Sequence, residues 1–405
     1  MLSPALLAAP EAEPEQPRAE RIPAQLGALL AAVVTFGFAH SAYFLLPKFL
    51  ALELHADASQ IGVYSSAMWF ANVALVPFAG LWIDRRGRMP FAFLGAAVLV
   101  GTCASFLAVD RLGPFLLALR IAHGVAFTFF FVATQTLAAD LAPPARLGQV
   151  LGYYGSGFVL TNAVAPAVAE WVAARAGWPT VFGATTALAA LSGLLLLFVR
   201  ERRATPHGDG SPVPGIGAAL ARTGFARVMG VSALAGVGFA AMFTFHQPFA
   251  LSLGIERVSD FFVAYSVTAG IVRGPFGSLA DRAGRMRVTR FSLAIYALAA
   301  FAMIALSRIG LVWTGALLGV AHGLFYPALN AVALEGAGSN VRGKVTALFN
   351  GSFNVGFSFG SLALGYIALA WGYPPLFALA GVCSLAALGL LFRRAPERLP
   401  EEEVT

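Results

Sequence analysis

Long apolar runs alternate with short polar segments along almost the whole chain. Each run holds about 20 mostly apolar residues, the length that one helix needs to cross the hydrocarbon core of a bilayer. Twelve such runs lie at residues 24–47, 58–83, 91–109, 113–138, 148–170, 178–199, 226–251, 259–280, 288–307, 310–333, 344–370 and 374–392. The pattern predicts twelve membrane-spanning helices, and because the number is even it places both chain ends on one side of the membrane.

The segment between the sixth and seventh runs interrupts the apolar pattern. It combines arginines with repeated prolines and glycines, a composition typical of a linker rather than of a membrane helix. The first residues are rich in proline and glutamate, which favours disorder. We therefore predict a disordered tail at 1–23, a six-helix bundle at 24–199, a linker at 200–225, a second six-helix bundle at 226–392 and a tail at 393–405.

Two loops at matched positions of the two halves share one spacing of residues. Residues 80–88 and residues 277–285 both fit the pattern G-x-x-x-D-R-x-G-R, and such self-similarity indicates a duplicated unit. Glycine allows a tight exit from a helix, and arginine favours the cytoplasmic side. We predict that these loops take part in gating, through Gly80, Asp84, Arg85, Gly87, Arg88, Gly277, Asp281, Arg282, Gly284 and Arg285.

At these loops the chain resembles the major facilitator superfamily of secondary transporters, which has this motif between spans 2 and 3 and a counterpart between spans 8 and 9. The repeat extends to Ala122-His123-Gly124 in the fourth run and Ala321-His322-Gly323 in the tenth. The resemblance covers about residues 24–392 and is nearest to the 12-span drug- or sugar-efflux branch. It implies an all-α integral membrane fold of twelve helices in two pseudo-symmetric six-helix bundles, around a cavity that opens alternately to each side.

Composition and charge agree with a membrane protein. The chain is 58% hydrophobic and 12% charged, against about 25% charged residues in soluble domains. Most of its 27 lysines and arginines lie in segments on the side of the chain ends; the opposite segments carry Lys48, Arg111, Arg175, Arg257 and Arg308. By the positive-inside rule we predict a multi-pass protein of the cell (inner or plasma) membrane with both termini cytoplasmic. The rule also accounts for the net charge of +7 without a nucleic-acid partner.

Motifs of enzymes and cofactor sites are absent from the sequence. It has no Walker lysine, no HExxH and no GxSxG pattern, and its two cysteines, Cys103 and Cys383, lie singly in apolar runs. We therefore predict no catalytic residue, no metal, no cofactor and no enzymatic activity. The expected partners are a small-molecule substrate, protons as a candidate coupling ion, and the lipid bilayer, and a monomer is expected.

Polar residues inside the apolar runs are the candidate cavity residues. An arginine in mid-membrane costs roughly 2.5–3.5 kcal/mol on insertion scales, so Arg120 is expected to face a cavity, with snorkelling to the headgroups as the alternative. The family's fourth span has an arginine followed four residues later by glycine, which implies a role in proton transfer for Arg120 with Gly124. The predicted cavity set is His40, Tyr43, Arg120, Gly124, Gln135, Pro166, His246, Gln247, Arg273, His322, Tyr326, Asn330, Asn350 and Asn354. Helix–helix hydrogen bonding is the alternative for the polar residues of the first, seventh, tenth and eleventh runs. For Arg273 the alternative is snorkelling to the inner membrane surface.

Two departures from the family pattern bear on function. The fifth run has Pro166 but alanines where antiporters of the family have glycines, and no Asp or Glu lies at mid-membrane. Proton coupling would then run through His40, His322 or Glu170, or not at all. The leading hypothesis is proton-coupled efflux of a small amphipathic compound. The alternatives are uptake or facilitated diffusion of a small organic anion or sugar and, more remotely, a transport-dead sensor or scaffold.

Overall fold

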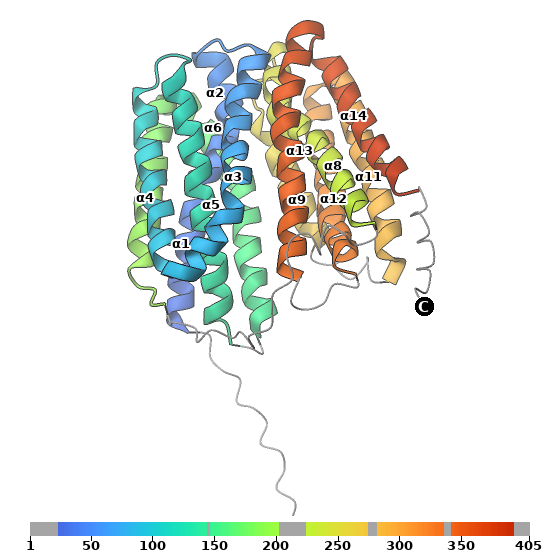
Figure 1. Ribbon diagram of the computed structural model, residues 1–405. Coiled ribbons are helices and arrows are strands. Elements are labelled where there is room, and N and C mark those ends of the chain that lie inside the picture. The colour runs from blue at the N-terminus through green and yellow to red at the C-terminus, as the bar shows by residue number, and fades with distance from the viewer. Residues whose placement is uncertain (1–22, 144–145, 202–223, 274–281, 336–341, 393–405) are drawn as a thin grey trace, which may run out of the picture.

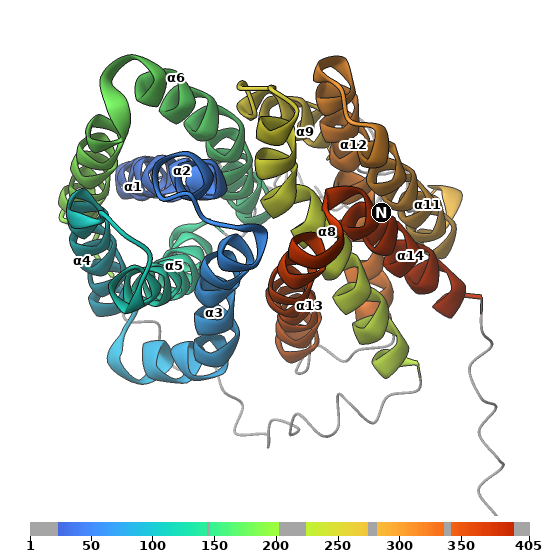
Figure 2. The same cartoon turned by 90° about the horizontal axis from the view of Figure 1, so that it is seen from above.

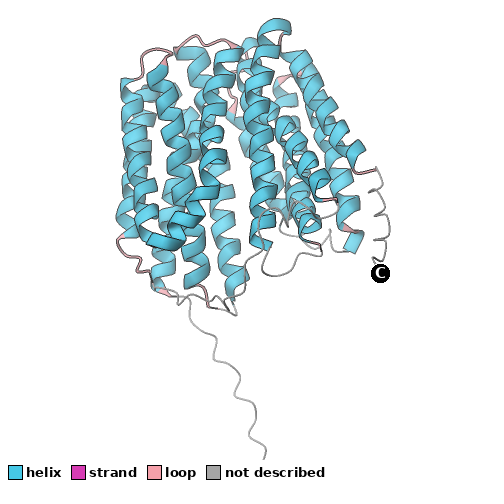
Figure 3. Ribbon diagram, viewed as in Figure 1, coloured by secondary structure: helices cyan, strands magenta, loops and turns pink. Residues whose placement is uncertain are grey.

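Helices account for the regular structure of the chain. The computed structural model describes residues 23–143, 146–201, 224–273, 282–335 and 342–392. Within these residues every regular element is helical and no strand is present (Figure 3). Ten of the described helices are long and apolar enough to cross a membrane. The prediction of an all-α integral membrane fold is confirmed.

The N-terminal half forms six membrane-spanning segments. The first runs through three consecutive elements, and the last two share one element, α6, which turns at Gly177. There the backbone takes a φ of +78°, a left-handed value that glycine adopts readily. The elements are α1 (Ala24–Ser41), η1 (Ala42–Leu45), α2 (Leu46–Glu53), α3 (Ala58–Arg86), α4 (Met89–Ser105), η2 (Phe106–Ala108), α5 (Pro114–Leu141) and α6 (Leu147–Leu196).

The C-terminal half repeats this plan. Its elements are α8 (Phe225–Ser252), α9 (Ser259–Arg273), α11 (Arg285–Ala302), η4 (Met303–Ala305), α12 (Arg308–Leu334), α13 (Arg342–Trp371) and α14 (Tyr373–Leu390). Each of the twelve predicted runs overlaps one of the described helices, with the fifth and sixth runs both in α6. The predicted N-terminal tail, apart from Pro23, the predicted C-terminal tail and most of the predicted linker lie outside the described residues.

The first span is longer than its apolar run. The run was expected to stop at Pro47, but Pro47 lies in the first turn of α2, where its missing N–H has no helical partner to lose and its fixed φ suits the helix. The helix therefore continues to Glu53. Lys48, expected in an outer loop, consequently lies within a helix that packs against other spans.

The two halves lie side by side. Figure 2 shows α1 to α6 grouped on one side and α8 to α14 on the other, with α3 next to α13 at the boundary. The α6–α9 and α2–α8 contacts also cross this boundary. In Figure 1 α2 lies near the top, and this end of the molecule is named the Lys48 end. The opposite end, where the loop after α3 lies, is named the Arg88 end.

Apolar side chains cover much of the outer surface. Phe198, Ile309 and Trp371 are each about 70% exposed, which would be unfavourable in water but is suited to lipid. Between these surfaces the helices satisfy their own backbone groups, as a bilayer requires. At the Lys48 end α3 begins with a capping box, in which Asp57 and Gln60 each accept the other's backbone N–H. Burial raises the pKa of Asp57, but hydrogen bonds from Ser59 and Gln60 outweigh it and hold the pKa below its ordinary value.

Candidate functional site

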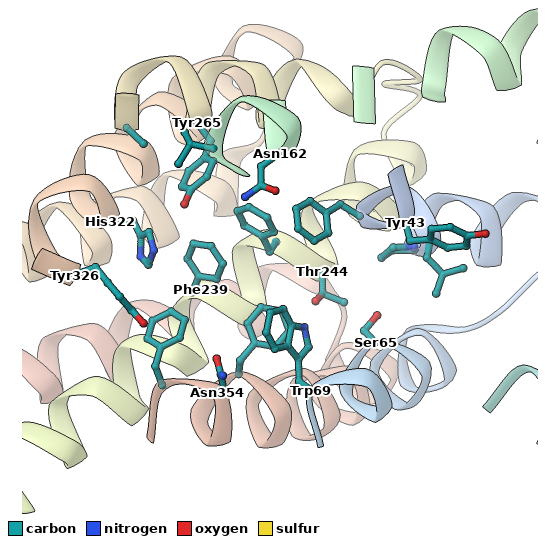
Figure 4. A pocket seen from close by; sticks show the side chains of 18 of the residues that line it. Tyr43, Ser65, Trp69, Asn162, Phe239, Thr244, Tyr265, His322, Tyr326 and Asn354 are labelled. Carbon is teal, nitrogen blue, oxygen red and sulfur yellow. The ribbon is translucent and has the colours of Figure 1, made fainter. Parts of the chain in front are cut away.

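A cavity of about 250 Å³ lies between the two groups of helices (Figure 4). Its walls come from η1, α2, α3, α5 and α6 on one side and from α8, α9, α12 and α13 on the other. The lining residues are Tyr43, Phe44, Leu46, Pro47, Ser65, Trp69, Arg120, Val159, Asn162, Phe239, Phe243, Thr244, Tyr265, Ala269, Arg273, His322, Tyr326, Phe353, Asn354 and Phe357. Because neither half encloses this space alone, a solute inside it contacts both.

Aromatic rings form much of the wall that the C-terminal half contributes. Phe239 stacks on Phe243 with 4.3 Å between ring centroids and lies 4.6 Å from the ring of His322. Trp69 of α3 lies 4.9 Å from Phe357 of α13, so rings of the two halves meet across the boundary. Figure 4 shows Phe239 and Trp69 among the side chains around the cavity. The wall suits a solute with an apolar or aromatic body.

Arg120 is the buried cation of the cavity and comes from the middle of the N-terminal half. Only 4% of the residue is exposed. Its Nε donates to the carbonyl oxygen of Tyr64 at 3.0 Å, and Nη2 lies 3.4 Å from Sδ of Met68. Nη1 is enclosed and finds no hydrogen-bond partner in the described structure. No carboxylate of the described residues lies within ion-pair distance of this guanidinium, so its burial is not explained by an ion pair within the described structure.

Histidines occupy two different environments near the cavity. His322 lines it, and its Nδ1 lies 2.5 Å from the hydroxyl of Tyr296 behind the wall. His40 and His123 are buried in the N-terminal half, with 3.0 Å between Nδ1 of His40 and Nε2 of His123. Of the two histidines proposed for proton coupling, His322 is therefore the one that a solute in the cavity can contact.

The structure brings together part of the predicted cavity set. Six of those residues line the cavity: Tyr43, Arg120, Arg273, His322, Tyr326 and Asn354. The other eight lie outside its lining: His40, Gly124, Gln135, Pro166, His246, Gln247, Asn330 and Asn350. Among these, Asn350 lies directly behind the wall, because its Oδ1 accepts from the Tyr326 hydroxyl at 2.5 Å. Gln135 is exposed, whereas Pro166 is buried and Asn330 half-buried.

Three of the residues outside the lining have clear packing or hydrogen-bonding roles. A Cβ on Gly124 would lie 2.2 Å from the carbonyl oxygen of Met68, so glycine there lets α5 approach α3 closely. His246 lies with Nδ1 2.6 Å from the carbonyl oxygen of Met242, one turn earlier in α8. Gln247 donates to the carbonyl oxygen of Phe44 at 2.7 Å and thereby joins α8 to η1.

Sequence reasoning missed most of the apolar wall. Trp69, Phe239 and Phe353 line the cavity, but an aromatic residue in an apolar run is equally typical of a lipid-facing or core position. Asn162 was detectable in principle, since it is an amide inside the fifth run. It accepts from Ser41 at 2.8 Å and lines the cavity beside α1.

A cluster of polar contacts joins the halves at the Lys48 end. Nζ of Lys48 lies 2.7 Å from the Glu170 carboxylate and also donates to the carbonyl oxygen of Glu256. The same carboxylate accepts the backbone N–H groups of Val258 and Ser259, each at 3.0 Å, and the Ser259 hydroxyl. Glu170 thus sits on the N-terminus of α9, a favourable place for an anion. These five residues are named the Glu170 cluster.

Hydrogen bonds between the halves are unevenly distributed along the molecule. Besides the Glu170 cluster, Gln247 bonds the backbone of Phe44 and Lys48 at the same end. At mid-height of α3, Asn354 donates to Asn72 at 3.0 Å. From there to the Arg88 end, no hydrogen bond between the halves is found among the described residues. Most of the hydrogen bonds between the halves that the described residues make therefore lie at the Lys48 end.

The first predicted gating loop is held by residues outside the motif. Nε of Arg88 lies 3.1 Å from the Asp140 carboxylate. The backbone N–H groups of Arg88 and Met89 donate to Glu201 at 2.8 and 3.1 Å, so Glu201 caps the start of α4. Asp84 and Arg85 are exposed, and Gly80 has open space around it. Gly87 takes a φ of +93°, which explains glycine at that position.

The second predicted gating loop lies partly outside the described residues, which exclude Gly277 and Asp281. Arg282 is exposed. Gly284 takes a φ of +90° and precedes α11, as Gly87 lies shortly before α4. Arg285 pairs with Glu335 at 3.4 Å. The equivalent glycines of the two loops thus share a left-handed conformation, which is a structural sign of the duplication.

Replacing Glu201 is expected to loosen the first loop. Glu201→Ala leaves two N–H groups at the start of α4 without their acceptor, and losing such a charged acceptor costs about 1–3 kcal/mol. For a chain of 405 residues this corresponds to a fall of roughly 1–4 °C in apparent melting temperature, measured by fluorescence in detergent. Glu53→Ala removes an exposed carboxylate and is the control. Equal melting temperatures for the two variants would show that Glu201 does not hold the loop.

Comparison with known proteins places the chain among membrane transporters. The family model for the Major Facilitator Superfamily matches residues 27–261 and 247–404. Multidrug resistance protein MdtL of Vibrio parahaemolyticus is 26% identical over 168 residues, which make up 41% of this chain and 42% of that protein. MdtL of Klebsiella pneumoniae is 27% identical over 163 residues, 40% of this chain and 41% of that relative. The matched stretch therefore spans about two fifths of these relatives.

Solved structures share the fold at low sequence identity. The structure of a bacterial homologue of the human lysosomal transporter Spinster, in an inward-facing and unoccupied conformation, superposes with a TM-score of 0.73. The two chains are 15% identical, and the match covers 91% of this chain and 94% of the other. At this identity the likeness establishes the arrangement of the helices.

Proposed function

This chain belongs to the Major Facilitator Superfamily of transporters, and on that premise we propose that it exports a small amphipathic compound in exchange for protons by alternating access. The observation that carries the proposal is the cavity with walls from both halves. A solute bound there can be passed from one side to the other if the halves rock about it. The concentration of contacts between the halves at one end supports the same mechanism.

The orientation of the molecule in the membrane follows from charge. We propose that the Arg88 end faces the cytoplasm, since the end of α3 and the segment after it carry Arg85, Arg86 and Arg88 and arginine favours that side. Both termini then lie on the cytoplasmic side of the cell (inner or plasma) membrane. In this orientation the Glu170 cluster lies on the outer side of the cavity and joins the halves there, which supports a conformation closed to the outside.

Export and proton coupling are the finer parts of the proposal. The relatives named multidrug resistance proteins support export. For the coupling we propose His322, because it lines the cavity and an imidazole ring can take up and release a proton. The absence of Asp and Glu from the described cavity lining favours a second candidate, facilitated diffusion or uptake of a small organic anion or sugar without protons.

Flux measurements in vesicles test the proposal. The purified chain is reconstituted into liposomes that hold a pH-sensitive dye, and pools of amphipathic metabolites and drugs are added on one side. We expect substrate addition to move protons in protein-containing vesicles and not in protein-free ones. Substrate flux without proton movement would contradict proton exchange and support facilitated diffusion. If no solute of any class moved across the membrane, the transport function itself would be contradicted.

Replacing His322 is expected to separate solute movement from proton movement. His322→Gln keeps a polar group near Tyr296 but removes the titratable one, so downhill solute flux continues while the ratio of protons to solute falls to the background. The measurement combines labelled solute with the dye signal. His55→Gln, which changes an exposed histidine at the Lys48 end, should retain the ratio of the unmodified protein. An unchanged ratio in His322→Gln would assign proton movement to another group.

A further inference from the structure

The charge of the cavity is one-sided. Its described lining holds two arginines, Arg120 and Arg273, and no aspartate or glutamate. A cationic solute would bring a third positive charge into a space of low dielectric without a countercharge. An anionic solute would instead reduce the excess of positive charge. The charge of the described lining, with Arg120 buried and Arg273 exposed, therefore favours an anionic solute over a cationic one.

Arg120 offers an unused donor beside this space. Its Nη1 finds no hydrogen-bond partner in the described structure. Its Nη2 contacts only the thioether sulfur of Met68, and only 4% of the residue is exposed. A guanidinium presents five N–H donors in a planar fork that matches a carboxylate. Thioether sulfur is a weak acceptor, so a carboxylate oxygen entering from the cavity would replace a poor contact with a charge-assisted one.

Aromatic side chains form another part of the cavity wall. Phe239, Phe353 and Phe357 form a continuous aromatic surface, with 5.6 Å between the centroids of Phe239 and Phe353 and 6.1 Å between those of Phe239 and Phe357. Figure 4 shows Tyr43 and Ser65 on one side of the cavity and His322 and Tyr326 on the other, with Phe239 between them. A flat ring that stacks among these side chains buries its faces against aromatic carbon.

We propose that the cavity binds a small aromatic carboxylate, with the carboxylate on Arg120 and the ring among Phe239, Phe353 and Phe357. The volume of about 250 Å³ lies just below the ~300–1,000 Å³ typical of pockets for drug-sized ligands, which favours one or two fused rings. The inference rests on the proposed transport function, because it names the solute class of the same cavity.

Equilibrium binding to the purified full-length chain tests the proposal without requiring transport. The probes are 1-naphthoate, the neutral 1-naphthamide and the cationic 1-naphthylmethylamine, which share a ring and differ in charge. We expect the anion to bind about 10- to 100-fold more tightly than the amide, the range for a charge-assisted contact, and the cation to bind more weakly than both. Cation binding as tight as anion binding would overturn the proposal, whether or not any variant folds.

Variants then assign the carboxylate contact. Arg120→Gln should weaken 1-naphthoate binding about 10- to 100-fold while leaving 1-naphthamide binding unchanged, which also shows that the cavity is intact. Arg111→Gln removes an exposed arginine from the α4–α5 loop and should leave all three affinities unchanged. Equal loss of anion and amide binding in Arg120→Gln would assign Arg120 a packing role and contradict the inference.

The same probes distinguish this inference from the proposed function. Binding of 1-naphthoate through Arg120 without flux in vesicles would contradict transport and leave the anion site standing. Flux of cations, with no binding of the carboxylate, would contradict the anion site and leave transport standing.

Discussion

Glu170→Gln is expected to shift the balance between the two conformations about 10- to 100-fold toward the one open at the Lys48 end. The Glu170 carboxylate accepts two backbone N–H groups of the C-terminal half and the Ser259 hydroxyl while it pairs with Lys48. An amide keeps the shape but has one oxygen where the carboxylate has two, and its NH₂ group faces N–H donors. Hydrogen bonds to a charged group contribute about 1.5–3 kcal/mol each, and 1.4 kcal/mol is tenfold in an equilibrium.

Burial makes this effect larger than for an ordinary surface ion pair. The side chains of Lys48 and Glu170 are 12% and 9% exposed, so water replaces their lost contacts poorly while the cluster is closed. When the halves separate at this end, Glu170 is hydrated in either variant. The substitution therefore destabilises the closed conformation selectively, which is the condition for a shift in population.

Spin-label distances across the boundary measure the shift. Labels are placed at the exposed residues Glu53 of α2 and Leu253 after α8, in a background where Cys103 and Cys383 are replaced by serine. Glu170→Gln should enlarge the long-distance population, and Asp110→Asn, which changes a carboxylate 87% exposed in the α4–α5 loop, should not. Identical distance distributions in the two variants would show that the Glu170 cluster does not hold the halves together.

The fold was predictable from the sequence because a membrane span needs only length and apolarity. Each predicted run overlaps a helix, and the repeated loop motif located the two halves. The span ends were less predictable. The run that stops at Pro47 placed Lys48 in a loop, whereas proline in the first turn allows α2 to continue. Glu170 was predicted only as one candidate group for proton coupling. Its contacts between the halves were not predicted, since its partners Val258 and Ser259 lie 88 and 89 residues away in the sequence.

The cavity was only partly predictable because hydropathy does not fix the rotation of a span about its axis. A helix that is apolar on all sides can turn any face to lipid, to a neighbour or to the cavity. Polar residues such as Arg120 and Asn354 signal the inner face, and both line the cavity. Gly124 lies one turn from Arg120 but packs against α3, and the aromatic wall around Phe239 carries no polar signal at all.

Gly62→Leu is expected to separate the halves at the Lys48 end and to slow transport roughly 5- to 150-fold. Gly62 of α3 meets α13 of the other half so closely that a Cβ would lie 2.4 Å from the carbonyl oxygen of Ser361. From the opposite side, a Cβ on Gly365 would lie 2.7 Å from the carbonyl oxygen of Ala58. The neighbours at both positions are backbone atoms, which cannot rotate away, so the helices themselves must move apart.

The expected size follows from the cost of overpacking. Inserting a larger side chain into a close contact typically costs 1–3 kcal/mol and occasionally more, which corresponds to roughly a 5- to 150-fold change in population at 1.4 kcal/mol per tenfold. The strain exists only in the conformation that brings α3 and α13 together at this end. A carrier must return to that conformation in every cycle, so its transport rate falls with the population of that state. Each half can still fold, because the contact lies between them.

Gly101→Leu provides the matched control. Gly101 is an exposed glycine of α4, and a Cβ there would have no neighbouring heavy atom within 4 Å. The same side chain added at this position should change neither the spin-label distances at the Lys48 end nor the rate of solute flux. Gly365→Leu should reproduce Gly62→Leu from the other helix. If Gly62→Leu and Gly365→Leu both keep the distances and the flux of the unmodified protein, then the α3–α13 contact is not one that has to open and close during transport.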